Sequence, residues 1–137
     1  MDLDEARDYL RSHHRAVLAT MRRDGTPQMS PVTASVDAEG YVVVSSRETA
    51  VKTKNVRRDP RAWLCAFPDS FYGDRFVQVE GEVSVVELPE AMDGLIEYYR
   101  SVSGEHPDWD DYRAAMVRDQ RVIVRITPER AGPDRAG

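Results

Sequence analysis

The sequence of 137 residues contains a single cysteine, and this shortage excludes several kinds of protein. Cys65 has no disulfide partner within the chain, and it lies in the apolar run 62–67. Cysteine and histidine also never occur at C-x-x-C or H-x-x-x-H spacing, which is common in metal sites. We therefore expect no metal site, and we expect Cys65 to be a small buried hydrophobic residue rather than a nucleophile.

Long apolar runs are missing as well. No stretch of 18 apolar residues is present that would span a bilayer. The N-terminal segment MDLDEARDYL is acidic and amphipathic, unlike a signal peptide. These features predict a cytoplasmic protein with no membrane contact.

The chain has no excess of positive charge. Its formal net charge is −5, which argues against a general nucleic-acid binder, because nonspecific binding depends on surplus lysine and arginine. Of the 19 basic residues, only Lys52 and Lys54 are lysine, and both fall in one segment. We expect no nucleic-acid partner, and the two lysines draw attention to their segment.

Several catalytic motifs are absent too. The sequence has no G-x-G-x-x-G, no P-loop and no G-x-S-x-G, so nothing supports a Rossmann, NTPase or α/β-hydrolase fold. Serine, histidine and aspartate occur, but their placement does not assemble a triad. We expect His13 and His14 to be helix-end or surface residues rather than ligands.

The elements that are present predict a mainly β protein. Strands are expected at 16–21, 28–36, 41–45, 62–67, 75–86 and 121–127, and helices at 3–13, between Thr49 and Asp59, at 88–102 and at 109–119. Six strands in mostly hairpin order favour an antiparallel barrel with flanking helices over an alternating βαβ sheet. Gly81, in the middle of its strand, predicts a bend or bulge. We expect residues 1–127 to form one domain and 128–137 to be a disordered tail.

The segment 41–60 has the composition of a binding site. An apolar strand passes through Ser45 and Ser46 into a basic helix whose first turn the Thr49 hydroxyl would cap. The two hydroxyls, the free amides of the helix N-terminus and Lys52 one turn in would together bind a phosphate. The alternative is that the basic residues form only a solvated helix face.

Pro31 interrupts the expected strand 28–36. Proline cannot donate a hydrogen bond to a ladder, so this strand should be an edge or be bulged at that point. Exposed backbone there would suit a flat ligand, although a proline that simply protects a strand edge explains the pattern equally well.

Four segments together resemble the split-barrel flavoprotein superfamily of the pyridoxamine 5′-phosphate oxidase type, and in particular its branch of deazaflavin (coenzyme F-420)-dependent oxidoreductases. They are AVLATMRRDGTPQMSPV, VVVSSRETAVKTKNVRRDPRAWLC, FVQVEGEVSVV and GEHPDWDDYRAAMVRDQRVIV. The resemblance covers about residues 10–127. It implies a six-stranded antiparallel split barrel of the FMN-binding-protein type.

The resemblance also implies a cofactor site. Lys52 would hold the cofactor phosphate with the strand-end hydroxyls, and strand 28–33 would lie against the deazaflavin ring, with backbone donors near Pro31 and Val32. A homodimer would complete the cleft through residues around 75–78 of the second subunit. The implied cofactor-binding residues are Gln28, Pro31, Val32, Thr33, Ser45, Ser46, Val51, Lys52, Lys54, Asn55 and Phe76.

The function implied is hydride transfer from coenzyme F-420 to a small organic acceptor such as an activated alkene, a quinone or a tetrapyrrole. The cofactor would carry the hydride, so no dedicated catalytic residue is expected. Two alternatives stay open: an FMN-binding enzyme like pyridoxamine-phosphate oxidase, and a cofactor- or tetrapyrrole-binding protein without turnover. No side chain in the sequence identifies the acceptor.

Overall fold

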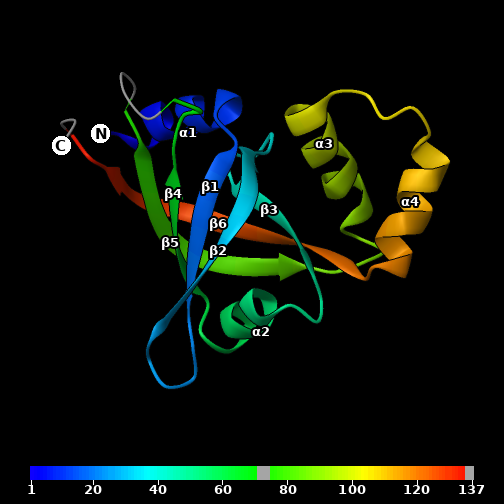
Figure 1. The fold of residues 1–137 in the computed structure, drawn as a ribbon, viewed down its shortest axis with the longest axis horizontal. Coiled ribbons are helices and arrows are strands. Elements are labelled where there is room, and N and C mark those ends of the chain that lie inside the picture. Colours follow the sequence, from blue (N-terminus) through cyan, green and yellow to red (C-terminus); the bar gives the residue numbers. More distant parts are fainter. Residues whose placement is uncertain (71–74, 135–137) are drawn as a thin grey trace.

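A computed structural model describes residues 1–70 and 75–134, and in it six antiparallel strands close into a barrel (Figure 1). The strands are β1 (Arg15–Met21), β2 (Pro27–Val36), β3 (Val42–Arg47), β4 (Arg61–Ala66), β5 (Val77–Val86) and β6 (Arg121–Gly132). Around the barrel their order is β1-β2-β3-β6-β5-β4, and β4 pairs with β1 to close it. The helices are α1 (Leu3–Ser12), α2 (Val51–Arg58), α3 (Met92–Ser103) and α4 (Trp109–Arg118). The structure confirms the expected mainly β antiparallel barrel with flanking helices.

Apolar side chains from alternate strand positions fill the barrel. Leu18, Val44 and Leu64 are each no more than 1% exposed, as expected where one face of a strand points to the core. Ala6 and Leu10 of α1 join this core at one end of the barrel, and Val56 of α2 joins it at the other. The two helices therefore close the ends of the barrel (Figure 1), and α2 carries the basic residues singled out in the sequence.

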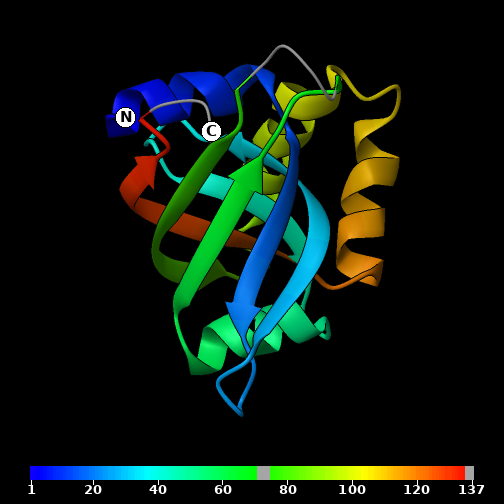
Figure 2. The ribbon, with the colours of Figure 1, turned by 60° about the vertical axis from the view of Figure 1, so that its left-hand side comes forward.

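A second apolar cluster fixes α3 and α4 to the outside of the barrel. Val43 and Ile123 on the outer face of β3 and β6 pack against Leu95 and Ile96 of α3 and Tyr112 of α4. Figure 2 shows the two helices together on one flank of the barrel. None of the helices in the described part of the chain is long and apolar enough to cross a membrane.

Strand β2 has a free edge along most of its length. It pairs with β1 from Pro27 to Thr33, but with β3 only from Ala34 to Val36. Pro31 therefore lies on an edge, as its missing N–H predicts. This edge forms one side of the cleft described below.

Strand β6 runs further than the sequence suggests. Residues 128–132, expected to begin a disordered tail, continue the strand and pair with β5, with Ala131 opposite Val79. The register shifts between Glu80 and Gly81, so the missing N–H of Pro128 falls at a bulge rather than in a regular ladder. A Cβ at Gly81 would lie 1.8 Å from the Thr127 carbonyl oxygen, which explains why glycine stands there. The predicted bulge at Gly81 is confirmed, and the tail prediction is wrong for 128–132.

Candidate functional site

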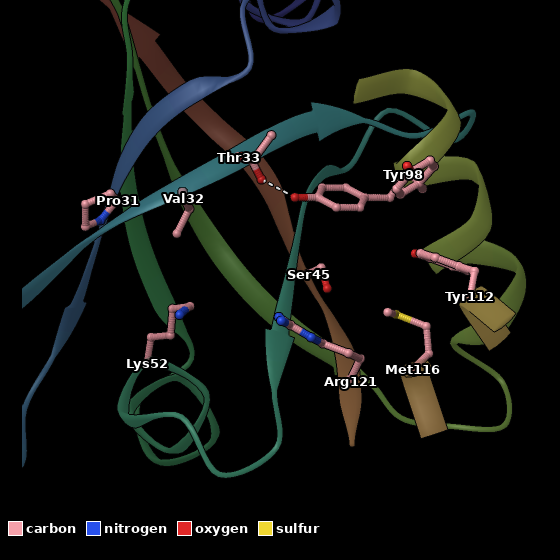
Figure 3. Close-up of a pocket in the computed structure, with 10 residues that line it drawn as sticks. Pro31, Val32, Thr33, Ser45, Lys52, Tyr98, Tyr112, Met116 and Arg121 are labelled. Atoms are coloured by element: carbon pink, nitrogen blue, oxygen red, sulfur yellow. Dashed lines mark hydrogen bonds between the residues drawn. The ribbon is translucent and has the colours of Figure 1, made fainter. Parts of the chain in front are cut away.

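The candidate site is a cleft of about 640 Å³ between the free edge of β2, the N-terminal end of α2 and the pair α3–α4 (Figure 3). Its size falls within the range common for small-molecule sites. Ten residues line it: Pro31, Val32, Thr33, Ser45, Lys52, Tyr98, Tyr99, Tyr112, Met116 and Arg121. The first five are among the residues predicted from the sequence.

One end of the cleft is strongly cationic. Lys52 extends from α2 and Arg121 from the start of β6 toward the same space (Figure 3), and Arg47 stands opposite Arg121 in the β3–β6 ladder. Burial, and then the positive charges of Arg121 and Arg47, lower the pKa of the Lys52 ammonium from its ordinary value. Among the described residues no carboxylate pairs with these three cations, and the buried Nε of Arg121 has no hydrogen-bond partner. We call Lys52, Arg121 and Ser45 the cationic corner.

Ser45 and Ser46 point to opposite sides of β3. The sequence suggested that the strand ends at Ser45, but it continues to Arg47, so adjacent side chains alternate between the two faces. Ser45 lines the cleft, whereas the Ser46 Oγ is fully buried and lies 2.8 Å from Thr53 Oγ1. Only one of the two predicted hydroxyls is therefore available to a ligand in this cleft.

The N-terminus of α2 is capped differently from the prediction. The N-cap residue is Ala50, which has no capping side chain, and Thr49 precedes it. The Thr53 hydroxyl donates instead to the Arg47 carbonyl at 2.6 Å, which ties the first turn of the helix to the end of β3. Because Ala50 has no capping side chain, the first backbone N–H groups of α2 have no side-chain cap. Free N–H groups at a helix N-terminus favour binding of an anion.

A buried chain of hydrogen bonds holds α2 on the barrel and uses two predicted site residues. The Asn55 side chain is 4% exposed and donates to Thr20 Oγ1 at 3.1 Å. Thr20 in turn lies 3.4 Å from Gln28 Oε1, and Arg58 donates to Asn55 Oδ1. Gln28 and Asn55 thus lie outside the cleft and fix the helix that carries Lys52.

The open edge of β2 presents backbone groups to the cleft. The amide of Ala34 donates to the His14 carbonyl at 2.8 Å, which faces Ala34 toward β1. The backbone N–H and C=O groups of successive residues in a strand point to opposite edges. Those of Val32 therefore point to β1, whereas the backbone groups of Pro31 and Thr33 point to the open edge. The Tyr98 hydroxyl donates to the Thr33 carbonyl at 2.7 Å, in agreement with this orientation. Because proline has no N–H, the backbone donor at this part of the edge belongs to Thr33.

The wall opposite the cationic corner consists of three tyrosines and a methionine from α3 and α4. Burial raises the pKa of Tyr98, and burial together with the nearby Tyr98 raises the pKa of Tyr112 to about 12. The Tyr112 hydroxyl donates to the Leu95 carbonyl at 2.8 Å, which joins the two helices. Both phenols are therefore neutral near pH 7, and the wall suits a flat aromatic ligand.

The remaining predicted residues lie away from this cleft. Val51 is 57% exposed at the start of α2, Lys54 is exposed on the next turn, and Phe76 lines a separate, shallow cavity beside Glu80 and Arg130. The structure therefore brings Pro31, Val32, Thr33, Ser45 and Lys52 together, and it leaves Gln28, Ser46, Val51, Lys54, Asn55 and Phe76 outside.

Sequence reasoning missed Arg121 and the tyrosine wall. Arg121 was visible only as the first residue of an alternating strand, and its approach to Lys52 depends on the pairing of β3 with β6. Tyr98 of α3 and Tyr112 and Met116 of α4 occur at the spacing expected for the buried face of an amphipathic helix. Tyr112 does belong to the apolar cluster that joins these helices to the barrel.

The geometry suits an elongated ligand with an anionic group and a planar ring. Cations and uncapped amides would hold a phosphate at one end, while the β2 edge and the tyrosines would hold a ring further along. The unpartnered Nε of Arg121 is the observation that most directly fits a bound anion.

Comparison with known families agrees with this geometry. The sequence model of the family described as pyridoxamine 5′-phosphate oxidase matches residues 3–133, nearly the whole chain. The match includes all the elements that form the cleft.

Solved structures with the same fold extend the comparison. A conserved hypothetical protein from Mycobacterium tuberculosis is 28% identical, with a TM-score of 0.78 over 96% of this chain and 82% of that one. An F-420 reductase is 23% identical, with a TM-score of 0.69 over 91% and 94% of the two chains. A heme binding protein from Mycobacterium smegmatis is 21% identical, with a TM-score of 0.73 over 98% of this chain and 56% of that one. The last two likenesses show the fold alone.

Proposed function

The chain belongs to the pyridoxamine 5′-phosphate oxidase family, and from this premise we propose that it is an oxidoreductase that uses the deazaflavin coenzyme F-420. The bound coenzyme would supply a hydride to a small organic acceptor such as an activated alkene, a quinone or a tetrapyrrole. The observation that carries the proposal is the cationic corner at the end of a cleft with an aromatic wall, where Lys52 and Arg121 have no carboxylate partner within residues 1–70 and 75–134.

The residues of the cleft would bind and orient the coenzyme. Lys52 and Arg121 would hold its phosphate by charge-assisted hydrogen bonds, and Ser45 would donate a third. The Thr33 N–H would hydrogen-bond to the polar edge of the ring, and the tyrosine wall would exclude water from its other side. Each of these contacts fixes the position of the ring without taking part in bond making.

We propose that the functional unit is a homodimer. Two apolar rows cross the outer surface of the sheet: Pro31, Val17 and Cys65 are opposite one another, as are Met29, Ala19 and Trp63. Met29 is 66% exposed, and no helix of the described chain crosses this surface in Figure 2. A second copy on these rows would cover apolar area that begins at the cleft residue Pro31.

The dimer would also give a role to Phe76. This residue is 39% exposed and lies outside the cleft of its own chain. Gln78, two residues along, stands opposite Cys65 and so ends one of the apolar rows. A partner on this surface would place its own segment 75–78 near the cleft, as the resemblance implies.

FMN is the alternative cofactor, because its phosphate would suit the cationic corner equally well. A fluorescence-quench titration with coenzyme F-420, FMN and riboflavin separates the possibilities. We expect micromolar or tighter binding of the deazaflavin and weaker binding of FMN. Riboflavin, which lacks the phosphate, should bind least.

The other outcomes each overturn the proposal in a defined way. Tighter binding of FMN would assign the protein to an FMN-dependent activity. Binding of neither cofactor would favour a tetrapyrrole or other ligand carrier without turnover. If the coenzyme does bind, reduction of a test quinone by the loaded protein distinguishes a reductase from a carrier.

A further inference from the structure

A second cavity, of about 620 Å³, adjoins the cleft at Val32 and Thr33. It lies where α1 ends and β1 begins, and it reaches Val102 at the end of α3 and residues 67–70 after β4. We call it the α1 chamber. Because both cavities share two residues of β2, a molecule in the α1 chamber would be a neighbour of a ring bound in the cleft.

His14 lines the α1 chamber and has a ring nitrogen without a hydrogen bond in the described chain. Its backbone carbonyl accepts from the Ala34 amide, and its Nδ1 lies 2.8 Å from the Ala34 carbonyl oxygen, so two contacts fix the residue against β2. A carbonyl oxygen only accepts, which means that Nδ1 carries the proton. No hydrogen bond within the described chain involves Nε2, and this nitrogen remains available to a ligand.

His13 and Arg15, the polar side chains on either side of His14, are each held by contacts with other residues of the chain. The His13 ring stacks on Tyr9 with centroids 4.0 Å apart, and its Nδ1 lies 3.0 Å from the Tyr9 carbonyl oxygen. Arg15 forms an ion pair with Asp69 at 3.2 Å. His14 alone of these three is anchored to β2, the strand that the chamber shares with the cleft, so we take it as the side chain best placed to exchange a proton with a molecule in the chamber.

We propose that the α1 chamber binds the electron-poor acceptor, a quinone or a carbonyl-conjugated alkene, and that His14 gives it a proton. The proposal rests on the proposed function for the source of the hydride. A quinone becomes a hydroquinone by gaining one hydride, here from the reduced deazaflavin coenzyme, and one proton. That proton leaves Nε2 of the His14 imidazolium as the new O–H bond forms, and neutral His14 regains a proton from water.

The chamber is tested first without any coenzyme. Menadione, a simple quinone, is titrated into the wild-type protein labelled with ¹⁵N at histidine, and the ring nitrogens are followed by NMR. The Nε2 resonance of His14 should shift to saturation. An unmoved His14 resonance would overturn the acceptor site, whether or not the protein binds a cofactor.

The proton-donor role is tested by His14→Gln, with Arg118→Gln, at an exposed position of α4, as the control. Glutamine keeps a hydrogen-bond donor for the Ala34 carbonyl but supplies no acidic proton. With menadione and reduced coenzyme, His14→Gln should lower kcat by about 100-fold, and Arg118→Gln by no more than about twofold. The coenzyme affinity of His14→Gln should stay within about twofold of wild type, which also shows that the variant is folded.

A His14→Gln variant that binds coenzyme normally and retains kcat within about threefold would overturn the proton-donor role. If the wild-type protein binds no deazaflavin, the proposed function fails instead. In that case the coenzyme-free NMR titration alone decides the α1 chamber.

Discussion

Helix α2 has two polar sides, and they differ in how completely their hydrogen-bonding groups are used. On the barrel side, Thr53 and Asn55 are buried and hydrogen-bonded to neighbouring strands, and Thr53 also pairs with the buried Ser46 of β3. On the cleft side, Lys52 faces Arg121 across open space without a carboxylate partner in the described chain. The same short helix therefore has buried polar side chains with hydrogen-bond partners on one side and, on the other, a lysine without a carboxylate partner in the described chain.

The difference separates structural groups from candidate ligand-binding groups. Buried polar atoms need partners because an unpaired one costs about 1–3 kcal/mol, so the barrel side must be satisfied for the helix to dock at all. The cationic corner, by contrast, gathers like charges that repel one another. Such a cluster is expected where an anion completes the charge balance.

The largest expected effect comes from breaking the barrel side. Asn55→Ala removes the bonds with Thr20 and Arg58 and leaves a small cavity, so the free energy of unfolding should fall by about 2–3 kcal/mol. Urea unfolding measures this loss. Lys54→Ala, on the exposed side of the same helix, is the control and should change stability by no more than about 0.5 kcal/mol. Equal losses in the two variants would remove the distinction between the sides.

Changing the cleft side should affect ligand affinity instead. Arg121→Gln should weaken coenzyme binding by about 1.5–3 kcal/mol, because a charged hydrogen bond to the phosphate is lost. Its stability in urea should not fall, since a repulsive charge is removed. Arg118→Gln changes an exposed arginine of α4 and should bind as wild type. A destabilised Arg121→Gln with unchanged affinity would contradict the assignment.

The adjacent serines provide a matched pair. The single proton of the Thr53 hydroxyl goes to the Arg47 carbonyl, so Ser46 must donate to Thr53. Ser46→Ala should therefore lower stability by about 0.5–1.5 kcal/mol and leave coenzyme affinity unchanged, and Ser45→Ala should do the reverse. Urea unfolding and quench titration of both variants check the contrast. The same response from both serines would show that they share one role.

The smallest effect concerns the pH dependence of stability. The pKa of Lys52 is lowered in the folded protein, so the unfolded chain binds more protons and stability rises with pH through the lowered pKa. Relative to Lys52→Met, the unliganded wild type should gain stability as pH increases and level off above the ordinary value of 10.5. Unfolding of both proteins at neutral and alkaline pH measures this. A difference that is constant or falls with pH would contradict the lowered pKa of Lys52, which burial and then the charges of Arg121 and Arg47 cause.

The fold was predictable from local patterns. Alternating apolar residues, turn signals and the glycine at position 81 predicted the barrel and its bulge, because these features depend on neighbours in the sequence. The end of β6 was not predictable, since Pro128 normally terminates a strand and is tolerated here only at the bulge in its pairing with β5.

The site was predictable only in part. Lys52 and the segment 31–33 lie in the cleft, and their signals were a rare lysine and a strand proline. Strand β3 continues two residues further than expected, and successive side chains of a strand point to opposite faces. Ser45 and Ser46 therefore point to opposite sides of the sheet. Arg121 enters the cleft through strand pairing between distant segments, which no local pattern reveals.

The cationic corner is tested most directly by the two lysines of α2. Lys52 lines the cleft and Lys54 is exposed, so Lys52→Met and Lys54→Met remove the same charge from the same helix. Quench titration with coenzyme F-420 should show a loss of about 1–3 kcal/mol, an increase of about 5- to 150-fold in Kd, for Lys52→Met and no loss for Lys54→Met. Equal affinities of the two variants would contradict a phosphate-binding role for the cationic corner.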